Sequence, residues 1–293
     1  MDQAHILREY MLRFNEQQQH PSLSRVITVT SGKGGVGKSN FTLNFALGLK
    51  ASGKKVVILD CDFSAANINI LMGVFPRYGL ADIMNQRKTI WETIEKGVNG
   101  IEYIYGGLEL EDLEKLNPAS FSYFWDQVQM LQTYCDFILL DTGAGISKHL
   151  VDFILASDET MLITTPEPTS VADAYGVLKA VAKHSKETPS SIRLVVNKAQ
   201  SYRDGLETSR ALKNTCRKFL KMNLNTLGFI LEDPHVSKAV RSQQAFSIAF
   251  PKTEASRNIK EIVRAYLPDS DKGAPPKGLR RFFEKVIAMA QTR

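Results

Sequence analysis

A glycine-rich loop near the start of the chain constrains the fold more than any other segment. It lies between a β-branched run, 26–30, and a segment with helical character, 40–51. Its residues fit the phosphate-binding pattern G-x-x-x-x-G-K-[ST] and are Gly32, Lys33, Gly34, Gly35, Val36, Gly37, Lys38 and Ser39, followed by Asn40. Glycines let successive backbone N–H groups surround a phosphate, and the following helix adds its positive N-terminal dipole. We therefore expect Lys38 to contact the β- and γ-phosphates of a nucleotide and Ser39 to ligate Mg²⁺.

Short apolar runs alternate with helical segments along the rest of the chain. We interpret as strands the runs 26–30, 55–60, 101–105, 137–141, 160–165, 192–197 and 226–231. This alternation predicts an α/β fold with a doubly wound, mostly parallel sheet, whose ligands bind beyond the carboxyl ends of the strands. Asp60, Asp62, Asp141 and Asn197 lie at or just after strand ends, so that one site can gather them with the glycine loop.

A second lysine, Lys33, lies inside the loop. The resulting K-G-G-x-G-K-S pattern resembles the deviant Walker A motif of the MinD, ParA and nitrogenase-iron-protein class of ATPases. The resemblance covers about residues 25–267 and implies the P-loop NTPase fold of that class (SIMIBI), with ATP and Mg²⁺ as cofactors. It also implies that Lys33 reaches across an ATP-bridged homodimer to the partner's phosphates, where a second cation stabilises the transferring charge. The alternative for Lys33 is a solvated loop lysine.

Two strand ends carry acidic residues that match the switch regions of the same class. Asp60-Cys61-Asp62 resembles switch I, which implies that Asp62 orients the attacking water and that Asp60 lies nearer the P-loop and the magnesium shell. Asp141 ends an apolar strand, as in a Walker B motif, and is expected to hold Mg²⁺ through a water. The division of roles between Asp60 and Asp62 stays open, and a pair of strand-end acids in a turn is the alternative to a catalytic role. Gly143 stands where MinD typically has proline, which departs from MinD but not from the ATPase class.

The base of the nucleotide is expected near two later segments. Val195-Val196-Asn197-Lys198 resembles the adenine-side motif of the class, because the Asn197 amide can both donate to and accept from a purine edge. The segment 227–234, which ends in Asp233 and Pro234, resembles the one that closes over the base. A buried or turn asparagine is the alternative for Asn197.

The N-terminal residues narrow the resemblance further. Residues 1–24 are interpreted as a short amphipathic helix and a linker. The start of this segment is similar to the D-Q-A-x-x-L-R motif of the flagellar MinD-like family called FlhG, YlxH or FleN, with Gln3, Leu7 and Arg8 in the matching positions. That family implies control of flagellar number and placement, activation of the SRP-type GTPase FlhF by this motif, and contact with flagellar switch-ring proteins. Packing of the helix on its own domain is the alternative.

The C-terminal segment has the pattern of a tethered membrane helix. After an ATPase domain over 25–266, residues 267–278 are rich in Pro, Gly and charge and predict a flexible linker. Residues 279–293 predict an amphipathic helix whose apolar face carries Leu279, Phe282, Phe283, Val286 and Ile287. Aromatic and aliphatic side chains opposite basic ones are typical of a helix that lies on anionic lipid. Docking of this helix in a groove of its own protein is the alternative.

Composition limits the remaining function classes. The formal net charge is +6, which permits anionic partners but selects none of them. Three separated cysteines and the lack of a long apolar run favour a cytoplasmic protein. The C-terminal amphipathic helix adds the expectation of reversible membrane association. A ParA-like partition ATPase that binds nonspecific DNA is the alternative function, but no helix-turn-helix or basic run supports it, and nucleic acid is not expected as a partner. An iron–sulfur carrier ranks last, because no Cys-x-x-Cys is present.

Overall fold

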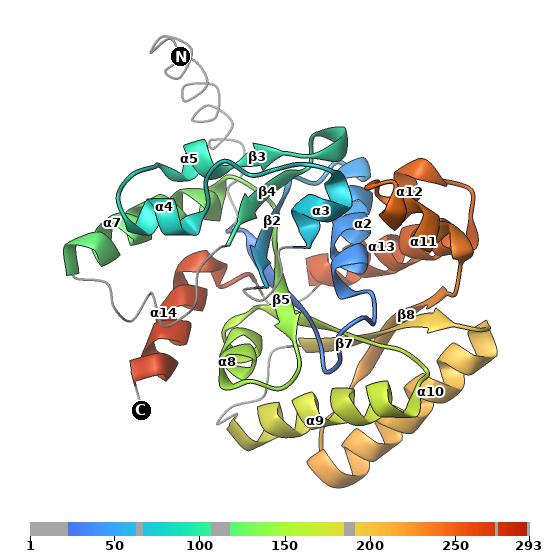
Figure 1. The fold of residues 1–293 in the computed structure, drawn as a ribbon. Coiled ribbons are helices and arrows are strands. Elements are labelled where there is room, and N and C mark those ends of the chain that lie inside the picture. Colours follow the sequence, from blue (N-terminus) through green and yellow to red (C-terminus); the bar gives the residue numbers. More distant parts are fainter. Residues whose placement is uncertain (1–22, 63–66, 107–117, 185–190, 273–274, 292–293) are drawn as a thin grey trace.

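The computed structural model describes residues 23–62, 67–106, 118–184, 191–272 and 275–291. In this part of the chain eight strands form one sheet in the order β3-β4-β2-β5-β1-β6-β7-β8. The strands are β1 (Arg25–Ser31), β2 (Val56–Cys61), β3 (Glu95–Lys96), β4 (Glu102–Tyr105), β5 (Phe137–Ala144), β6 (Glu159–Thr164), β7 (Ser191–Ala199) and β8 (Asn225–Leu231). All neighbours pair in parallel except β3 and β4 (Figure 1). The predicted doubly wound sheet is confirmed; the short antiparallel β3 was not predicted.

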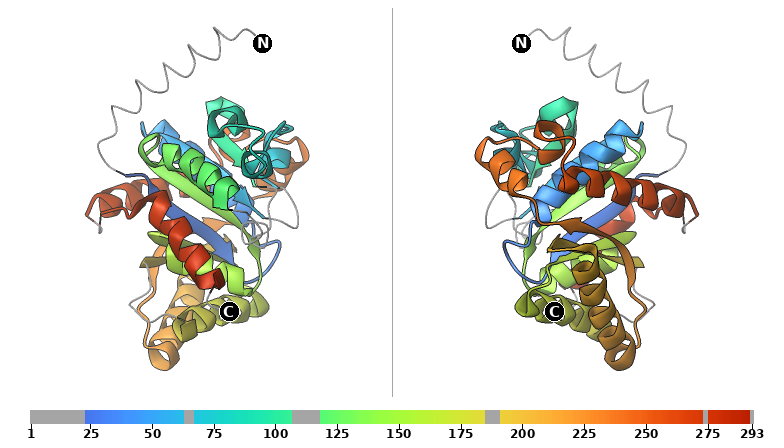
Figure 2. Two further views of the ribbon diagram at one scale, coloured as in Figure 1. Left: turned by 90° about the vertical axis from the view of Figure 1, so that its left-hand side faces the viewer. Right: turned by 90° about the vertical axis from the view of Figure 1, so that its right-hand side faces the viewer.

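Helices cover both faces of the sheet (Figures 1 and 2). One face is covered by α2 (Lys38–Ala51), α3 (Ile68–Met72), α11 (Pro234–Arg241), α12 (Phe246–Ala249) and α13 (Glu254–Lys272). The other face carries α4 (Leu80–Met84), α5 (Ile90–Thr93), α7 (Pro118–Gln129), α8 (Lys148–Ala156), α9 (Pro168–His184), α10 (Tyr202–Thr215) and α14 (Gly278–Gln291). Single turns η1 (Val98–Gly100), η2 (Met130–Thr133) and η3 (Cys216–Leu220) complete the connections.

The strand sequences explain the two cores. Alternate residues of a strand point to opposite faces, and in β1 Val26 packs into one core while Ile27 and Val29 pack into the other. Every residue of β1 is buried, as expected for a central parallel strand with helices on both sides. This burial holds β1 rigid, so the loop that follows it starts from a fixed point.

The linker prediction for 267–278 was wrong over its first six residues. Helix α13 continues to Lys272 and contains Pro268, which is exposed. Leu267 packs against the core, and the Ser270 backbone carbonyl accepts a hydrogen bond of 3.1 Å from the buried Arg25 guanidinium. A proline breaks one backbone hydrogen bond of a helix. These tertiary contacts outweigh that loss, so composition alone pointed to the wrong structure.

The C-terminal helix α14 is docked, and its apolar face does not lie in solvent. Leu279, Phe282, Phe283 and Val286 are buried in the core that contains α7 and α8; the side chain of Ile287 lies outside the described part of the chain. The Phe282 ring stacks on Phe153 of α8 with centroids 5.3 Å apart. The docking alternative is therefore the arrangement present here.

No helix among the described residues has the length and hydropathy to cross a bilayer. The predicted N-terminal helix, with Gln3, Leu7 and Arg8, falls in 1–22, outside the described residues.

Candidate functional site

The glycine loop runs from the end of β1 to the first turn of α2, and two of its glycines are required by sterics. Gly37 has φ +90°, and a Cβ there would lie 2.3 Å from the Asn197 amide nitrogen. A Cβ on Gly32 would lie 2.3 Å from the backbone of Asp173 in α9. L-residues rarely adopt such a φ, and neither neighbour leaves room for a side chain. The loop therefore packs closely against β7 and α9, which restricts its conformation as expected for a phosphate-binding loop.

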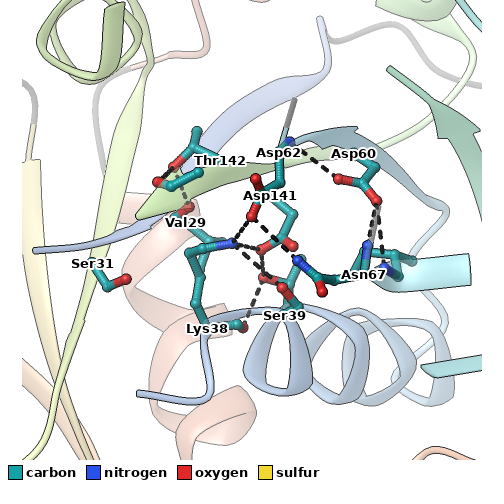
Figure 3. A network of polar contacts seen from close by, with 12 residues as sticks. Val29, Ser31, Lys38, Ser39, Asp60, Asp62, Asn67, Asp141 and Thr142 are labelled. Atoms are coloured by element: carbon teal, nitrogen blue, oxygen red, sulfur yellow. Dashed lines mark hydrogen bonds and ion pairs between the residues drawn. The ribbon is translucent and has the colours of Figure 1, made fainter. Parts of the chain in front are cut away.

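Lys38 lies at the centre of a buried polar network (Figure 3). Its ammonium is 3.0 Å from Asp141 Oδ1, 3.4 Å from Ser39 Oγ and 3.9 Å from Asp62 Oδ2. Lys38 comes from α2, Asp62 follows β2, and Asp141 lies in the buried part of β5, so three separate segments supply the charges. The structure brings together the lysine, the hydroxyl and two of the carboxylates predicted from the sequence.

Asp60 and Asp62 face different groups although only Cys61 separates them. Asp60 accepts hydrogen bonds from the backbone N–H groups of Asp62, Asn67 and Ile68 at 3.1, 3.3 and 3.4 Å. Burial, with a further contribution from the charge of Asp141, raises the pKa of Asp60 to about 6. Asp62 instead accepts from the Asn67 side chain at 3.2 Å and approaches Lys38. Asp60 therefore holds the backbone after β2. The expectation that Asp60 lies nearer the glycine loop was wrong, because its oxygens accept these backbone N–H groups, and Asp62 is the acid that approaches Lys38.

Asn197 and Lys198 at the end of β7 attach this strand to the glycine loop. Asn197 Nδ2 donates to the Val36 carbonyl at 2.7 Å, and Lys198 Nζ donates to the Gly35 carbonyl at 2.8 Å. Successive strand residues normally point to opposite faces, but Lys198 has φ +55°, which turns its side chain out of that alternation. Two loop carbonyls are thereby held toward β7. The sequence marked Asn197 for the base but gave no signal that it also supports the loop.

A cleft of about 1240 Å³ opens beside this network. It is lined by the loop and α2, by Asp62 and Asn67, by Asn197 and Lys198, and by the segment from the end of β8 through α11, which includes Asp233 and Pro234. Asp233 caps α11 by accepting from the His235 N–H at 2.9 Å, and its other oxygen accepts from the Ala255 N–H at 3.3 Å. Burial alone raises the pKa of Asp233, but these hydrogen bonds outweigh burial and lower it. The phosphate-side and base-side residues predicted separately thus line one cleft.

Lys33 does not line this cleft. Its ammonium lies 2.9 Å from Glu167 Oε2 and 2.8 Å from Thr169 Oγ1, at the start of α9, and its side chain is 38% exposed. The hydrogen bond from Lys33 lowers the pKa of Glu167. The second lysine of the loop is therefore directed to the protein surface, away from the nucleotide cleft of its own chain.

Comparison with known proteins agrees with this geometry. Residues 22–267 match the family model described as ParA, NUBPL iron-transfer P-loop NTPase. The chain belongs to the ParA family. It is 32% identical to the antiactivator FleN of Pseudomonas aeruginosa over 90% of this chain and 93% of FleN, and 30% identical to the flagellum site-determining protein YlxH of Helicobacter pylori over 90% of each. Its fold is similar to that of MinD from Pyrococcus horikoshii in complex with Mg-ADP, with a TM-score of 0.66, 23% identity and coverage of 85% and 99% of the two chains.

As a member of the ParA family, this chain is a P-loop ATPase, and its polar network can be compared with what a nucleotide-bound magnesium ion requires. Mg²⁺ in such sites is held by hydroxyl and carboxylate oxygens together with nucleotide phosphates and water. Asp141 is fully buried beside Lys38 and Ser39, and its Oδ2 has no hydrogen-bond partner in the part of the chain that the structure describes. An unpaired buried carboxylate oxygen next to a hydroxyl fits the outer shell of a magnesium ion. Ser39 and Asp141 are therefore the residues that fit the metal.

The family description mentions iron transfer, but the cysteines of this chain are poorly suited to bind an iron–sulfur cluster. Iron–sulfur clusters are held by thiolates. Cys61, Cys135 and Cys216 are all buried, and they lie in two different cores. Burial raises the pKa of Cys135 to about 12 and that of Cys216 to about 11, so these thiols stay protonated. The nucleotide site carries the evidence for function.

Proposed function

We propose that this ATPase is a molecular switch that controls the number or placement of flagella, with ATP hydrolysis as its timer. The proposal is supported by relatives whose names denote regulators, FleN as an antiactivator and YlxH as a flagellum site-determining protein, each matched over 90% of this chain. The observation that most supports a switch is that Lys33 points away from the cleft of its own chain. A lysine in this position can contact a nucleotide that is bound to a second copy of the chain.

Each residue of the cleft has a role in this proposal. Backbone N–H groups of the glycine loop and Lys38 bind the phosphates, and a bound magnesium ion would supply positive charge that neutralises the charge developing there. Ser39 and Asp141 hold that ion. Asp62, which faces Lys38, orients the attacking water. Asp60 keeps the backbone around Asp62 in place, because its oxygens accept three backbone N–H groups.

ATP-dependent dimerisation follows from the position of Lys33. In the free chain the Lys33 ammonium donates hydrogen bonds to Glu167 and Thr169, and both bonds are exposed to solvent. Exposed ion pairs contribute little, about 0–1 kcal/mol, so the lysine can exchange them for a triphosphate on a second copy. ADP lacks the γ-phosphate, so it offers Lys33 of a second copy fewer contacts than ATP does. The dimer therefore forms with ATP and dissociates after hydrolysis.

Membrane attachment requires that α14 leave its groove. On its basic side Arg281 is exposed, whereas Lys285 is half-buried and its ammonium lies 3.5 Å from the Leu155 carbonyl; its aromatic residues are buried. A single released helix binds anionic lipid weakly, but two helices on one dimer bind with avidity. The groove lies on α8, whose first turn follows the segment after Asp141. A change in that segment on ATP binding can thus weaken the docking of α14.

The partners of the switch are proposed from the flagellar resemblance. The motif with Gln3, Leu7 and Arg8 activates an FlhF-type GTPase, and the ATPase domain contacts switch-ring proteins. A peptide of residues 1–20 added to an FlhF-type GTPase tests the first contact: GTP turnover rises if the motif acts alone. No rise at saturating peptide would contradict this role.

Lys33→Gln tests the switch, with Lys252→Gln as a matched control at an exposed lysine near the start of α13. Light scattering with a nonhydrolysable ATP analogue should give a dimer for wild type and control, and a monomer for Lys33→Gln that still binds ATP. ATP turnover of Lys33→Gln should fall at least about 100-fold, because a charge-stabilising donor is lost. Only wild type and control should restore normal flagellar counts to a flagellated host that lacks its own copy. A Lys33→Gln protein that dimerises and restores the counts would refute the proposal.

A further inference from the structure

Thr42 is a buried hydroxyl at the back of the nucleotide site. It lies in α2, one helical turn after Lys38, and is fully buried. Its Oγ1 is 2.8 Å from Asp141 Oδ1, the same oxygen that Lys38 approaches at 3.0 Å. Among the described residues, Asp141 Oδ2 has no hydrogen-bond partner. Within this part of the chain the two oxygens of the carboxylate are thus unequal: Oδ1 receives Lys38 and Thr42, and Oδ2 receives no donor.

The hydroxyl proton of Thr42 has two possible acceptors. The Lys38 carbonyl lies 3.1 Å away, in the usual position for a threonine within a helix, and Asp141 Oδ1 lies at 2.8 Å. A charged carboxylate forms shorter and stronger hydrogen bonds than a neutral carbonyl. The shorter distance agrees with that preference, so the proton goes to Asp141.

Nucleotide binding changes the partners of Asp141 but leaves Thr42 where it is. Lys38 has a single ammonium, and in the proposed function it moves to the phosphates. Asp141 then loses its cationic partner, and Thr42 becomes the donor that remains on Oδ1 among the contacts described. The terminal torsion of an aspartate is broad, so a carboxylate without such a donor can turn.

We propose that Thr42 is a positioning residue that fixes the Asp141 carboxylate once Lys38 has moved to the phosphates. By binding Oδ1 it keeps Oδ2 directed to the water shell of the magnesium ion. This inference rests on the proposed nucleotide switch and adds to it a residue that touches neither nucleotide nor metal. Partners of this kind typically contribute 10- to 100-fold to metal affinity.

Thr42→Val removes the hydroxyl and keeps the shape, and Thr42→Ser restores the hydroxyl. Thr93→Val is the matched control, since Thr93 is also fully buried and, among the described residues, its hydroxyl bonds only the nearby Ile90 carbonyl at 2.7 Å. Fluorescent ADP is titrated in EDTA and at increasing Mg²⁺, and thermal unfolding is recorded for each variant. We expect Thr42→Val to bind ADP in EDTA like wild type, and to need about 10- to 100-fold more Mg²⁺ for the metal-dependent gain. Thr42→Ser should return to within about threefold of wild type.

Several outcomes would overturn the proposal. Wild-type Mg²⁺ dependence in Thr42→Val removes the role, and so does equal loss of ADP binding with and without Mg²⁺, which marks a structural residue. If Thr42→Val unfolds at the assay temperature while Thr93→Val does not, Thr42→Ala and Thr42→Ser are compared, and an equal Mg²⁺ requirement in these two refutes the hydroxyl's role. If ADP binding by the wild-type protein does not depend on Mg²⁺, the magnesium site of the proposed function is refuted, and the role of Thr42 at that site is refuted with it.

Discussion

The nucleotide cleft and the groove under α14 are parts of one sheet structure, but different forces hold them. In the cleft, buried charges such as Lys38 and Asp141 meet at 3.0 Å, and hydrogen bonds fix their neighbours. In the groove, aromatic rings pack together, with Phe282 on Phe153 and Phe283 on Phe124 at centroid distances of 5.3 and 5.8 Å. Polar contacts depend on position and partner, so a ligand must replace them one for one. Apolar contacts are less selective, so α14 can leave when another apolar surface is offered.

The strongest test of the polar side of this comparison is Lys38→Ala. We expect loss of nucleotide binding and, without nucleotide, a free energy of unfolding lowered by about 3–5 kcal/mol, because Asp141 is left as a buried, unpaired charge. Urea denaturation and fluorescent-nucleotide titration measure the two effects. The double variant Lys38→Ala with Asp141→Asn should regain most of the stability and none of the binding. Unchanged stability of the single variant would mean that the pair is not a buried ion pair in solution.

Phe282→Ala tests the apolar side. If α14 stays docked in the free protein, removing this side chain should lower the free energy of unfolding by about 3–5 kcal/mol. Phe75→Ala is the matched control, because Phe75 is 86% exposed while Phe282 is 1% exposed. The control should change stability by less than about 0.5 kcal/mol. Equal, small effects for both variants would show that α14 is released in the monomer.

The raised pKa of Asp60, beside the polar network of the cleft, predicts that stability depends on pH. Its pKa is raised to about 6 in the folded chain from a model-peptide value of 3.8, so between these pH values the folded state binds more protons than the unfolded one. The free energy of unfolding should therefore fall as pH rises from about 4 to about 6, by on the order of 2–3 kcal/mol. Asp60→Asn should remove that part of the slope in nucleotide-free protein. A difference curve that stays flat would place Asp60 in a more solvated setting.

The smallest expected effect concerns the outer side of α14. Arg281 is exposed, so Arg281→Gln should leave stability unchanged. If the released helix binds anionic lipid, this change should weaken ATP-dependent vesicle binding by about 1 kcal/mol, or roughly fivefold. Co-sedimentation with anionic vesicles measures the effect, and neutral vesicles are the control. Vesicle binding that ignores Arg281, salt and nucleotide would assign α14 to protein packing.

The two regions also differ in how far their sequences revealed them. The glycine loop, Asp62, Asp141 and Ser39 were placed correctly at one edge of the sheet, because parallel strands bring their carboxyl ends together. The contacts of Thr42 and Lys198 were missed, since they are made with distant segments that no local spacing encodes. The contact of Asn67 was missed although its partner, Asp62, is only five residues away, because it depends on how the chain turns after β2. The same limit explains the error at 267–272, where proline and charge predicted a linker but Arg25 and the core stabilise a helix.

The sequence by itself determined the fold class and the phosphate-binding chemistry, because both follow from local patterns: strand periodicity, glycines that allow a tight loop, and acids at strand ends. It also determined that α14 has one apolar face. Only the tertiary structure decided where that face goes, which way Lys33 points, and which of two neighbouring aspartates faces the loop. The reason is that an amphipathic helix or an exposed lysine is compatible with several partners, and the partner present in space selects among them.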